Sequence, residues 1–201
     1  MTDTKQIIER ISAVPLTNGR RIIAIAGPPA SGKSTLSATL SKEMPHACVV
    51  PMDGFHRSND DLERHNLLSR KGAPQTFDVA GFTNVIYALK QRGHVPFPTF
   101  DRTNDCVIER GGNVAASDTT ILVEGNYLLL NVAPWNELAM MWDFSIQIQV
   151  PIDILKMRLI ERWMRHEHSE EEAVLRVARN DLPNAELTLA QGFPANLIIS
   201  S

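Results

Sequence analysis

Apolar and polar residues alternate along the chain in a pattern that predicts short buried strands separated by amphipathic helices. Apolar residues at helical spacing predict helices over 3–14, 33–43 and 78–91. Five apolar runs have the length of buried strands: 21–26, 47–52, 120–125, 144–150 and 196–200. Strands that alternate with helices indicate an α/β fold, in which helices cover both faces of a central parallel sheet.

Local signals place the ends of several helices. Asp78 can cap the helix that follows it, and Ser169 with Glu172 forms a capping box for a later helix. Pro151 follows an apolar run and is expected at the first position of a long helix. These signals predict a helical segment between the strand at 144–150 and the end of the chain.

The chain is expected to form a single domain over residues 1–201, because no repeat, low-complexity segment or linker divides it. Within it, residues 54–77 are polar and irregular, which predicts a loop with one short helix. Residues 94–118 contain prolines, paired glycines and short β-like pieces, which favours a hairpin.

Composition narrows the class of protein. The 201 residues are 43% hydrophobic, enough for a folded core. The net charge of −3 argues against a general nucleic-acid surface. The apolar runs are shorter than a membrane span, and the N-terminus lacks a signal pattern. We expect a cytoplasmic protein with a small-molecule partner, no nucleic acid and no membrane; a homodimer remains open.

Cysteine and histidine spacing gives no reason to expect a zinc site. Cys48 and Cys106 stand far apart in the sequence and show no metal-ligand spacing. His166 and His168 lie two residues apart, a poor helical spacing for sharing a metal ion, so we expect both to be solvated.

The nine residues from 27 to 35 fit the phosphate-binding pattern G-x-x-x-x-G-K-[ST] at every fixed position. A predicted strand precedes them and a predicted helix follows, which is the context that the pattern requires. Backbone N–H groups there can surround a phosphate, while the lysine reaches the β- and γ-phosphates and the serine binds Mg²⁺. We therefore expect ATP and Mg²⁺ to bind through Gly27, Pro28, Pro29, Ala30, Ser31, Gly32, Lys33, Ser34 and Thr35.

Two carboxylates follow predicted strands. Asp53 comes after the strand at 47–52, and Glu124 lies near the end of the strand at 120–125. Parallel strands end at one edge of a sheet, so both carboxylates should lie near the phosphate loop. Each can accept a hydroxyl proton or order the water of a magnesium ion. Asp53 is equally compatible with an ordinary Asp-Gly turn, and Glu124 with a strand-end carboxylate that is satisfied by its neighbours.

Several further side chains are compatible either with a role in the site or with an ordinary structural position. Arg158, Arg162 and Arg165 share a helix face that can clamp a transferring phosphoryl group or can simply be solvated, with Glu161 paired to Arg165. Arg70 and Lys71 can meet an anionic group or lie on the surface, and the sequence does not choose. The aromatic residues beside the strands can line a substrate site or belong to the core: Phe97, Phe100 and Tyr127.

Several sequence segments resemble the pantothenate kinase, uridine kinase and phosphoribulokinase group of P-loop kinases. The matching segments are Asp53-Gly54-Phe55-His56, 68–74, Phe77-Asp78, 98–102 and 124–127. Within that group, the chain is most similar to short bacterial kinases labelled as fructose-transport-associated, and the resemblance covers roughly 20–200. It implies a P-loop NTPase fold of three α/β/α layers, with a central parallel sheet and a helical lid.

The resemblance also implies residue roles. Asp53 matches the base that accepts the substrate's hydroxyl proton, and Glu124 matches the Walker B carboxylate, so that Ser34 and Glu124 are the candidate Mg²⁺ ligands. Lys33 and Arg162 complete the candidate catalytic set. Contacts to the acceptor substrate are expected from Asp53, His56, Asp101 and Arg102. The end of the site that holds the nucleotide base is expected near Asn180, Asp181 and Asn184.

The expected activity is that of an ATP-dependent kinase which phosphorylates a hydroxyl group of a small molecule, with a sugar such as fructose as the expected acceptor. Pantothenate or a nucleoside is the alternative acceptor. The chain departs from both patterns: it lacks the long N-terminal extension of bacterial pantothenate kinases, and it has Arg162-Trp163-Met164-Arg165-His166 where uridine kinases have an Arg-Gly-Arg lid. A nucleotide-dependent ATPase switch is the rival class.

Overall fold

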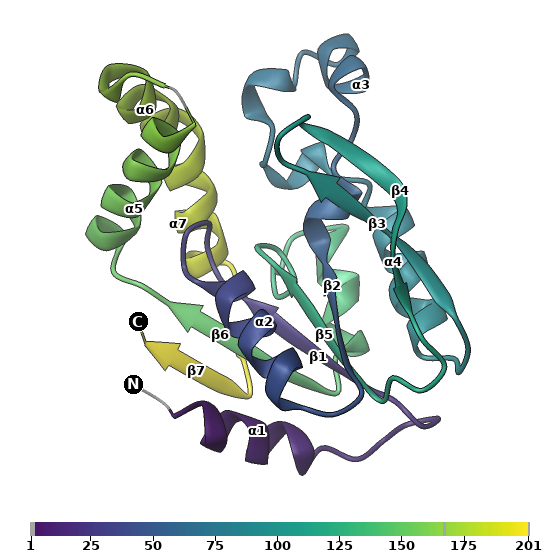
Figure 1. The fold of residues 1–201 in the computed structure, drawn as a ribbon. Helices are drawn as coiled ribbons and strands as arrows, with labels where there is room; N and C mark the ends of the chain where they lie inside the picture. Colours follow the sequence, from purple (N-terminus) through teal and green to yellow (C-terminus); the bar gives the residue numbers. More distant parts are fainter. Residues whose placement is uncertain (1–2, 167, 201) are drawn as a thin grey trace.

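The computed structural model describes residues 3–166 and 168–200, and its centre is a five-stranded sheet (Figure 1). Its strands lie in the order β2-β5-β1-β6-β7, and each neighbouring pair is parallel. This confirms the central parallel sheet expected from the sequence. The strand bounds are β1 Arg21–Ala26, β2 Ala47–Pro51, β5 Thr120–Gly125, β6 Phe144–Gln149 and β7 Leu197–Ser200.

Helices cover both faces of the sheet. Along β1, Ile22 and Ala24 belong to one buried cluster, whereas Ile23 and Ile25 belong to another, because successive residues of a strand point to opposite faces. The first cluster packs against α4 (Val79–Leu89), and the second against α1 (Thr4–Ser12), α2 (Lys33–Glu43) and α5 (Ile152–Arg165). The result is the three-layer α/β/α arrangement.

Two groups of elements extend from the same edge of the sheet on opposite sides (Figure 1). One, here called the lid arm, consists of α5, α6 (Glu170–Arg176) and α7 (Leu182–Ala190). The other, here called the acceptor arm, consists of α3 (Asn59–Arg64), the segment 68–77 and an antiparallel hairpin of β3 (Val95–Asp101) and β4 (Cys106–Val114). The hairpin was predicted, and so was a short helix in the 54–77 loop, which also contains 3-10 turns at Leu68–Arg70 and Pro74–Thr76.

Most predicted helix ends are confirmed, and one is corrected. The Asp78 carboxylate accepts a hydrogen bond from Gly81 N at 2.9 Å, and Ser169 forms its capping box with Glu172. Pro151, however, is not the first helical residue. Its ψ of 139° is extended, and the helix begins at Ile152, so Pro151 supplies only the first carbonyl of the helix, which accepts from Leu155 N at 3.0 Å.

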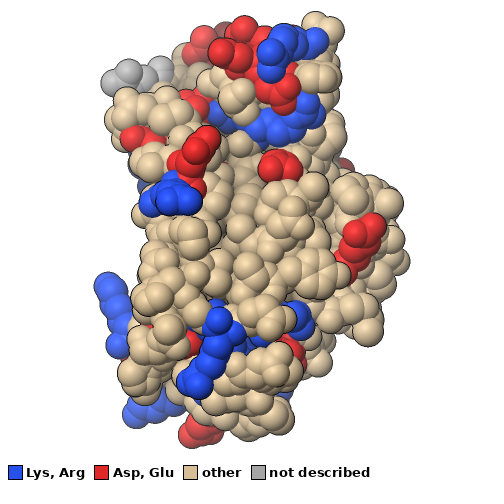
Figure 2. Space-filling model, turned by 90° about the vertical axis from the view of Figure 1, so that its right-hand side faces the viewer, with Lys and Arg blue, Asp and Glu red and all other residues tan. Residues whose placement is uncertain are grey.

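Figure 2 views the molecule from the side of the acceptor arm. Acidic and basic side chains are intermixed at the upper end of this face, and a broad uncharged area lies below them. None of the helices in residues 3–166 and 168–200 is long and apolar enough to cross a membrane.

Candidate active site

A cavity of about 810 Å³ lies between the two arms, where the strands β2 and β5 end. The phosphate loop forms its floor. At Gly27 the backbone approaches β6 so closely that a Cβ atom would lie 2.9 Å from the Ile148 carbonyl oxygen. At Gly32 the backbone has a φ of 95°, a left-handed conformation that favours glycine. Both glycines of the motif are therefore required by the backbone path itself.

The first turn of α2 is suited to bind an anion. Its N-cap residue is Gly32, which has no side chain to cap the helix, so the first N–H groups of this eleven-residue helix have no side-chain acceptor there. The positive end of the helix faces the same cavity, which Lys33, Ser34 and Thr35 line. This arrangement fits a phosphate group.

Lys33 is buried at the floor, with only 7% of its surface exposed, and its Nζ donates to the Pro28 carbonyl oxygen at 2.9 Å. Burial lowers the pKa of Lys33 to about 8, although the negative charges of Glu124 and Asp53 act in the opposite direction. The ammonium group is thus charged at neutral pH but close to its titration range.

The titration of Lys33 predicts how nucleotide affinity depends on pH. Only the charged ammonium attracts the triphosphate, so the dissociation constant for Mg-ATP should be nearly constant just below pH 8. Above that pH it should rise by up to about tenfold per pH unit, because binding must then include uptake of a proton. Equilibrium titrations between pH 7.5 and 9.5 test this. Lys33→Arg, which stays charged in this range, is the matched control and should show a flat profile; a flat wild-type profile would contradict the prediction.

The sheet register brings the two candidate carboxylates to the cavity. Pro51 of β2 lies opposite Glu124 of β5, and the chain continues from Pro51 into a 3-10 turn that carries Asp53. Both carboxylates line the cavity, and an Asp53 oxygen pairs with the Arg102 guanidinium of the hairpin. The structure therefore places Asp53 and Glu124 beside the phosphate loop, as the parallel topology led us to expect.

Ser34 and Glu124 form an oxygen pair that fits the preferences of Mg²⁺. The Ser34 hydroxyl donates to Glu124 Oε1 at 3.1 Å, and Glu124 is only 8% exposed. Burial raises the pKa of Glu124, which the nearby charge of Lys33 partly offsets. A hydroxyl and a carboxylate at the foot of a phosphate loop are the kind of hard oxygen donors that hold Mg²⁺ beside a bound triphosphate.

One wall of the cavity is formed by three neighbouring rings: His56 and Phe77 are stacked, and His56 and Phe100 are tilted against each other. The His56 ring lies 4.1 Å from the Phe77 ring and 4.8 Å from the Phe100 ring, measured between centroids, and Lys71 Nζ lies 5.0 Å from the centre of Phe100. Burial lowers the pKa of His56 to about 4, so its imidazole is neutral at physiological pH. Of the three aromatic residues that could line a substrate site or belong to the core, only Phe100 lines the cavity. Phe97 and Tyr127 are core residues.

Arg70 and Lys71 have different surroundings in the structure. Lys71 faces the cavity, whereas Arg70 points toward the lid arm and donates to the Arg179 carbonyl oxygen at 2.5 Å. Lys71 Nζ lies 2.8 Å from Asp105 Oδ1 and 2.7 Å from Asn59 Oδ1. Asp105 belongs to the hairpin tip and Asn59 to α3, so this contact joins three parts of the acceptor arm.

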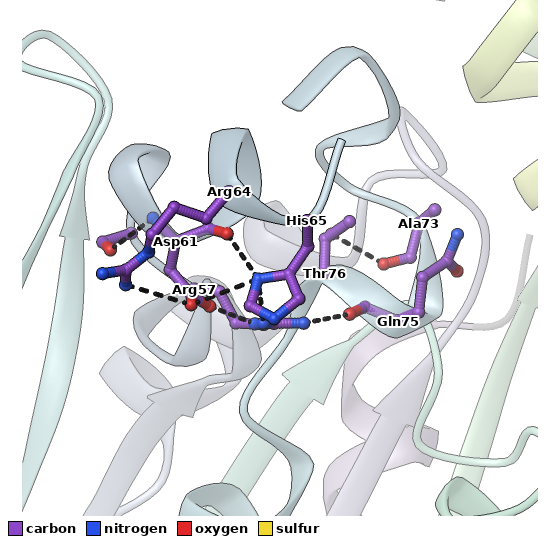
Figure 3. Close-up of polar contacts among 8 residues, drawn as sticks. Arg57, Asp61, Arg64, His65, Ala73, Gln75 and Thr76 are labelled. Atoms are coloured by element: carbon purple, nitrogen blue, oxygen red, sulfur yellow. Dashed lines mark hydrogen bonds and ion pairs between the residues drawn. The ribbon is translucent and has the colours of Figure 1, made fainter. Parts of the chain in front are cut away.

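A second polar network lies around Arg57, between α3 and the segment 68–77 of the same arm (Figure 3). Arg57, which follows His56, donates to Asp61 at 2.5 Å and to the Gln75 carbonyl oxygen at 3.4 Å, and its guanidinium lies 3.2 Å from His65 Nδ1. These contacts connect α3 to the segment 68–77. They hold the backbone next to His56 and Phe77.

The three arginines of the predicted lid face have different surroundings. Arg162 lines the cavity, and burial lowers its pKa. Arg158 donates to the Ala30 carbonyl oxygen at 3.5 Å. Arg165 is exposed, and its Nη2 lies 3.6 Å from Glu161 Oε2. This agrees with the alternative that Arg165 is solvated and paired to Glu161. Arg162 is thus the one of the three that lines the cavity.

The Asn180–Asn184 segment connects the two arms. Asn180 Nδ2 donates to the Lys71 carbonyl oxygen at 2.9 Å, and Asn184 donates to Asn180 at 3.4 Å. Asp181 lines the cavity and accepts from Trp163 Nε1 at 2.7 Å. Two of these three residues therefore hold the segment 70–72 against the lid arm.

The sequence analysis missed several cavity residues, and some of the residues that it expected at the site do not line the cavity: Gly27, Pro28, Ser31, Asp101, Asn180 and Asn184. Asp101 is not among the lining residues; its carboxylate accepts from Thr103 N at 2.9 Å and from Asn104 Nδ2 at 2.7 Å, and so closes the hairpin turn. His166 is exposed, as expected, and His168 is half-buried; both line the cavity. Asn126 directly follows β5 within the matching segment 124–127, so its place at a strand end could have indicated it. The other missed residues carry no local signal, because the fold alone brings them there; they include Asn59, Asp105, Trp163 and Arg176.

Comparisons with known proteins agree with this geometry. No family model matches the chain. Three curated proteins are similar to it over most of its length. Escherichia coli YggC is 37% identical and is covered over 84% of its length. The Schizosaccharomyces pombe protein named "Putative uridine kinase C227.14" is 32% identical over 82% of this chain and 76% of its own length. Pantothenate kinase of Lactococcus lactis is 31% identical over 81% of this chain and 53% of its own length.

A solved structure extends the agreement. The crystal structure of the "putative fructose transport system kinase" from Silicibacter sp. TM1040 is 40% identical, with a TM-score of 0.94 over 99% of this chain and all of the other. The phosphate loop, the strand-end carboxylates and the lid arm occur here in the arrangement that a phosphoryl-transfer site requires. The chain belongs to the P-loop kinases of the pantothenate kinase and uridine kinase group.

Proposed function

We propose that this kinase transfers the γ-phosphoryl group of ATP to a hydroxyl group of a neutral sugar such as fructose. The acceptor oxygen forms the new bond to the γ-phosphorus, the bond to the β–γ bridging oxygen breaks, ADP leaves, and the hydroxyl proton passes to Asp53. Backbone N–H groups of the phosphate loop and Lys33 hold the triphosphate. Mg²⁺ held by Ser34 and Glu124 would neutralise charge on the phosphate oxygens.

The observation that carries the choice of acceptor is the charge balance of the acceptor arm. Each of its two cavity-lining cations already has a carboxylate partner: Lys71 pairs with Asp105 at 2.8 Å, and Arg102 pairs with Asp53. An acceptor with its own carboxylate, such as pantothenate, would have to compete with these partners. A neutral acceptor needs only hydrogen bonds, which the polar groups of the arm can supply.

The aromatic wall supports the same class of acceptor. Phe100, Phe77 and the neutral His56 ring present apolar faces, beside the polar groups of Asn59 and Lys71. A sugar has both kinds of surface, with C–H groups that can lie against rings and hydroxyls that need donors and acceptors. The name of the similar Silicibacter protein, "putative fructose transport system kinase", also favours a sugar.

A coupled assay of ADP release tests the proposal. Ketoses including fructose, aldoses, pantothenate and nucleosides are offered separately with Mg-ATP. We expect little hydrolysis without an acceptor and the highest kcat/KM with a neutral sugar. A preference for pantothenate or a nucleoside would overturn the choice of acceptor. Turnover that responds to none of these small molecules would favour an ATPase switch.

Arg162 is proposed to stabilise the transferring phosphoryl group. Arg162→Ala should lower kcat by about 10²–10³-fold, the usual effect of removing one donor aimed at developing charge. Arg165→Ala removes the same group from the exposed side of the same helix and should leave kcat close to that of wild type. Steady-state rates of both variants test the assignment. Equal losses in the two variants would mean that the helix, rather than the Arg162 side chain, matters.

A further inference from the structure

Lys71, Asp105 and Asn59 form a closed set of contacts at the edge of the cavity. Asp105 Oδ1 lies 2.8 Å from Lys71 Nζ, and Asp105 Oδ2 accepts from Asn59 Nδ2 at 2.8 Å. Asn59 Oδ1 in turn accepts from Lys71 at 2.7 Å. Both oxygens of Asp105 are therefore bound, and all three residues line the cavity.

The two charged partners differ in exposure. The Lys71 side chain is only 10% exposed and lies over the Phe100 ring, whereas Asp105 is 54% exposed at the hairpin tip. A largely buried ammonium group needs a counter-charge. Among the described residues, Asp105 provides the carboxylate that lies within ion-pairing distance of Lys71. The same carboxylate places a negative charge at the mouth of the acceptor side, where it repels anions.

We propose that Asp105 determines the charge of the acceptor that this kinase takes. By neutralising Lys71, it makes the acceptor side selective for uncharged polyols and against acceptors that carry a carboxylate or phosphate group. This inference rests on the proposed transfer to a neutral sugar. It adds a specificity-determining residue on the hairpin, one that takes no part in the transfer itself.

Asp105→Asn tests the inference by a gain of function. Asparagine keeps the shape and can still accept a hydrogen bond from Lys71, but it leaves the ammonium charge uncompensated. We expect the ratio of kcat/KM for D-gluconate to kcat/KM for the preferred neutral sugar to rise at least about tenfold. The substitution removes a negative charge that repels the gluconate carboxylate and leaves the positive charge of Lys71 free to attract it. The gain should vanish in the Lys71→Met/Asp105→Asn double variant, which lacks the ammonium group.

Asp60→Asn is the matched control, because it makes the same charge change at an exposed position beside Asn59 that does not line the cavity. Its ratio should equal that of wild type. An unchanged ratio in a folded Asp105→Asn protein, or a gain that persists without Lys71, would overturn the inference.

A binding experiment separates this inference from the proposed function. Calorimetric titration of D-gluconate into protein loaded with a non-hydrolysable ATP analogue and Mg²⁺ requires no turnover. Asp105→Asn should bind D-gluconate at least about tenfold more tightly than wild type. If wild type phosphorylates no sugar but this difference appears, the proposed function fails and the role of Asp105 stands. If sugars are phosphorylated and the affinities are equal, only the role of Asp105 fails.

Discussion

Lys33→Ala should lower kcat by at least about 10²–10³-fold, the usual effect of removing one donor aimed at developing charge. Negative charge develops on the oxygen that bridges the β- and γ-phosphates during transfer. Lys33 is the cation at the floor of the cavity that can stabilise this charge. The methyl group of alanine offers neither charge nor hydrogen bond. Saturating ATP should not restore the rate, because the interaction acts on the transition state.

The fold of Lys33→Ala should remain intact. The lowered pKa of Lys33 means that the folded protein disfavours the ammonium charge. Removing this charge at neutral pH therefore loses no net favourable electrostatic interaction. The melting temperature should therefore stay close to that of wild type. Lys42→Ala, at an exposed position in the last turn of the same helix, is the matched control and should retain wild-type kcat. Wild-type turnover in a folded Lys33→Ala protein would refute the assignment.

Asp53→Asn should lower acceptor phosphorylation by about 10²–10⁴-fold, the range that general-base assistance commonly supplies. Asparagine keeps the size of the side chain and can still accept a hydrogen bond from Arg102, but it cannot take up the hydroxyl proton at neutral pH. The affinity for Mg-ATP should stay near that of wild type, because the phosphate loop and the Ser34–Glu124 pair are unchanged.

Three measurements on one preparation decide the role of Asp53: nucleotide affinity, acceptor-dependent turnover and hydrolysis without acceptor. Loss of acceptor turnover with ATP binding retained supports a base. Loss of ATP binding, with acceptor turnover retained at saturating nucleotide, would show instead that Asp53 serves the nucleotide or its metal ion. Background hydrolysis need not fall in step, since water can be oriented without this carboxylate.

The sequence by itself was sufficient for the elements whose causes are local. The strand, loop and helix over residues 21–43 were predicted with their bounds, because the left-handed glycine, the apolar run and the helix start act within a few residues of one another. The cap at Asp78 and the capping box at Ser169 are likewise short-range hydrogen bonds, and both are confirmed. Parallel topology then placed Asp53 and Glu124 at the same edge of the sheet.

Only the tertiary structure decided which side chains reach the cavity from the two arms. Arg162 and Arg165 share a helix, yet Arg162 lines the cavity whereas Arg165 is exposed and pairs with Glu161. Which side of the helix faces the cavity depends on how α5 packs against the rest of the fold. Asp101 was expected at the acceptor and closes a turn instead, while Asp105, four residues later, meets Lys71 across 34 residues of sequence. Hydrophobic periodicity and capping act over a few residues. Such long-range pairings depend on how the hairpin, α3 and the lid arm pack together, which no short sequence pattern encodes.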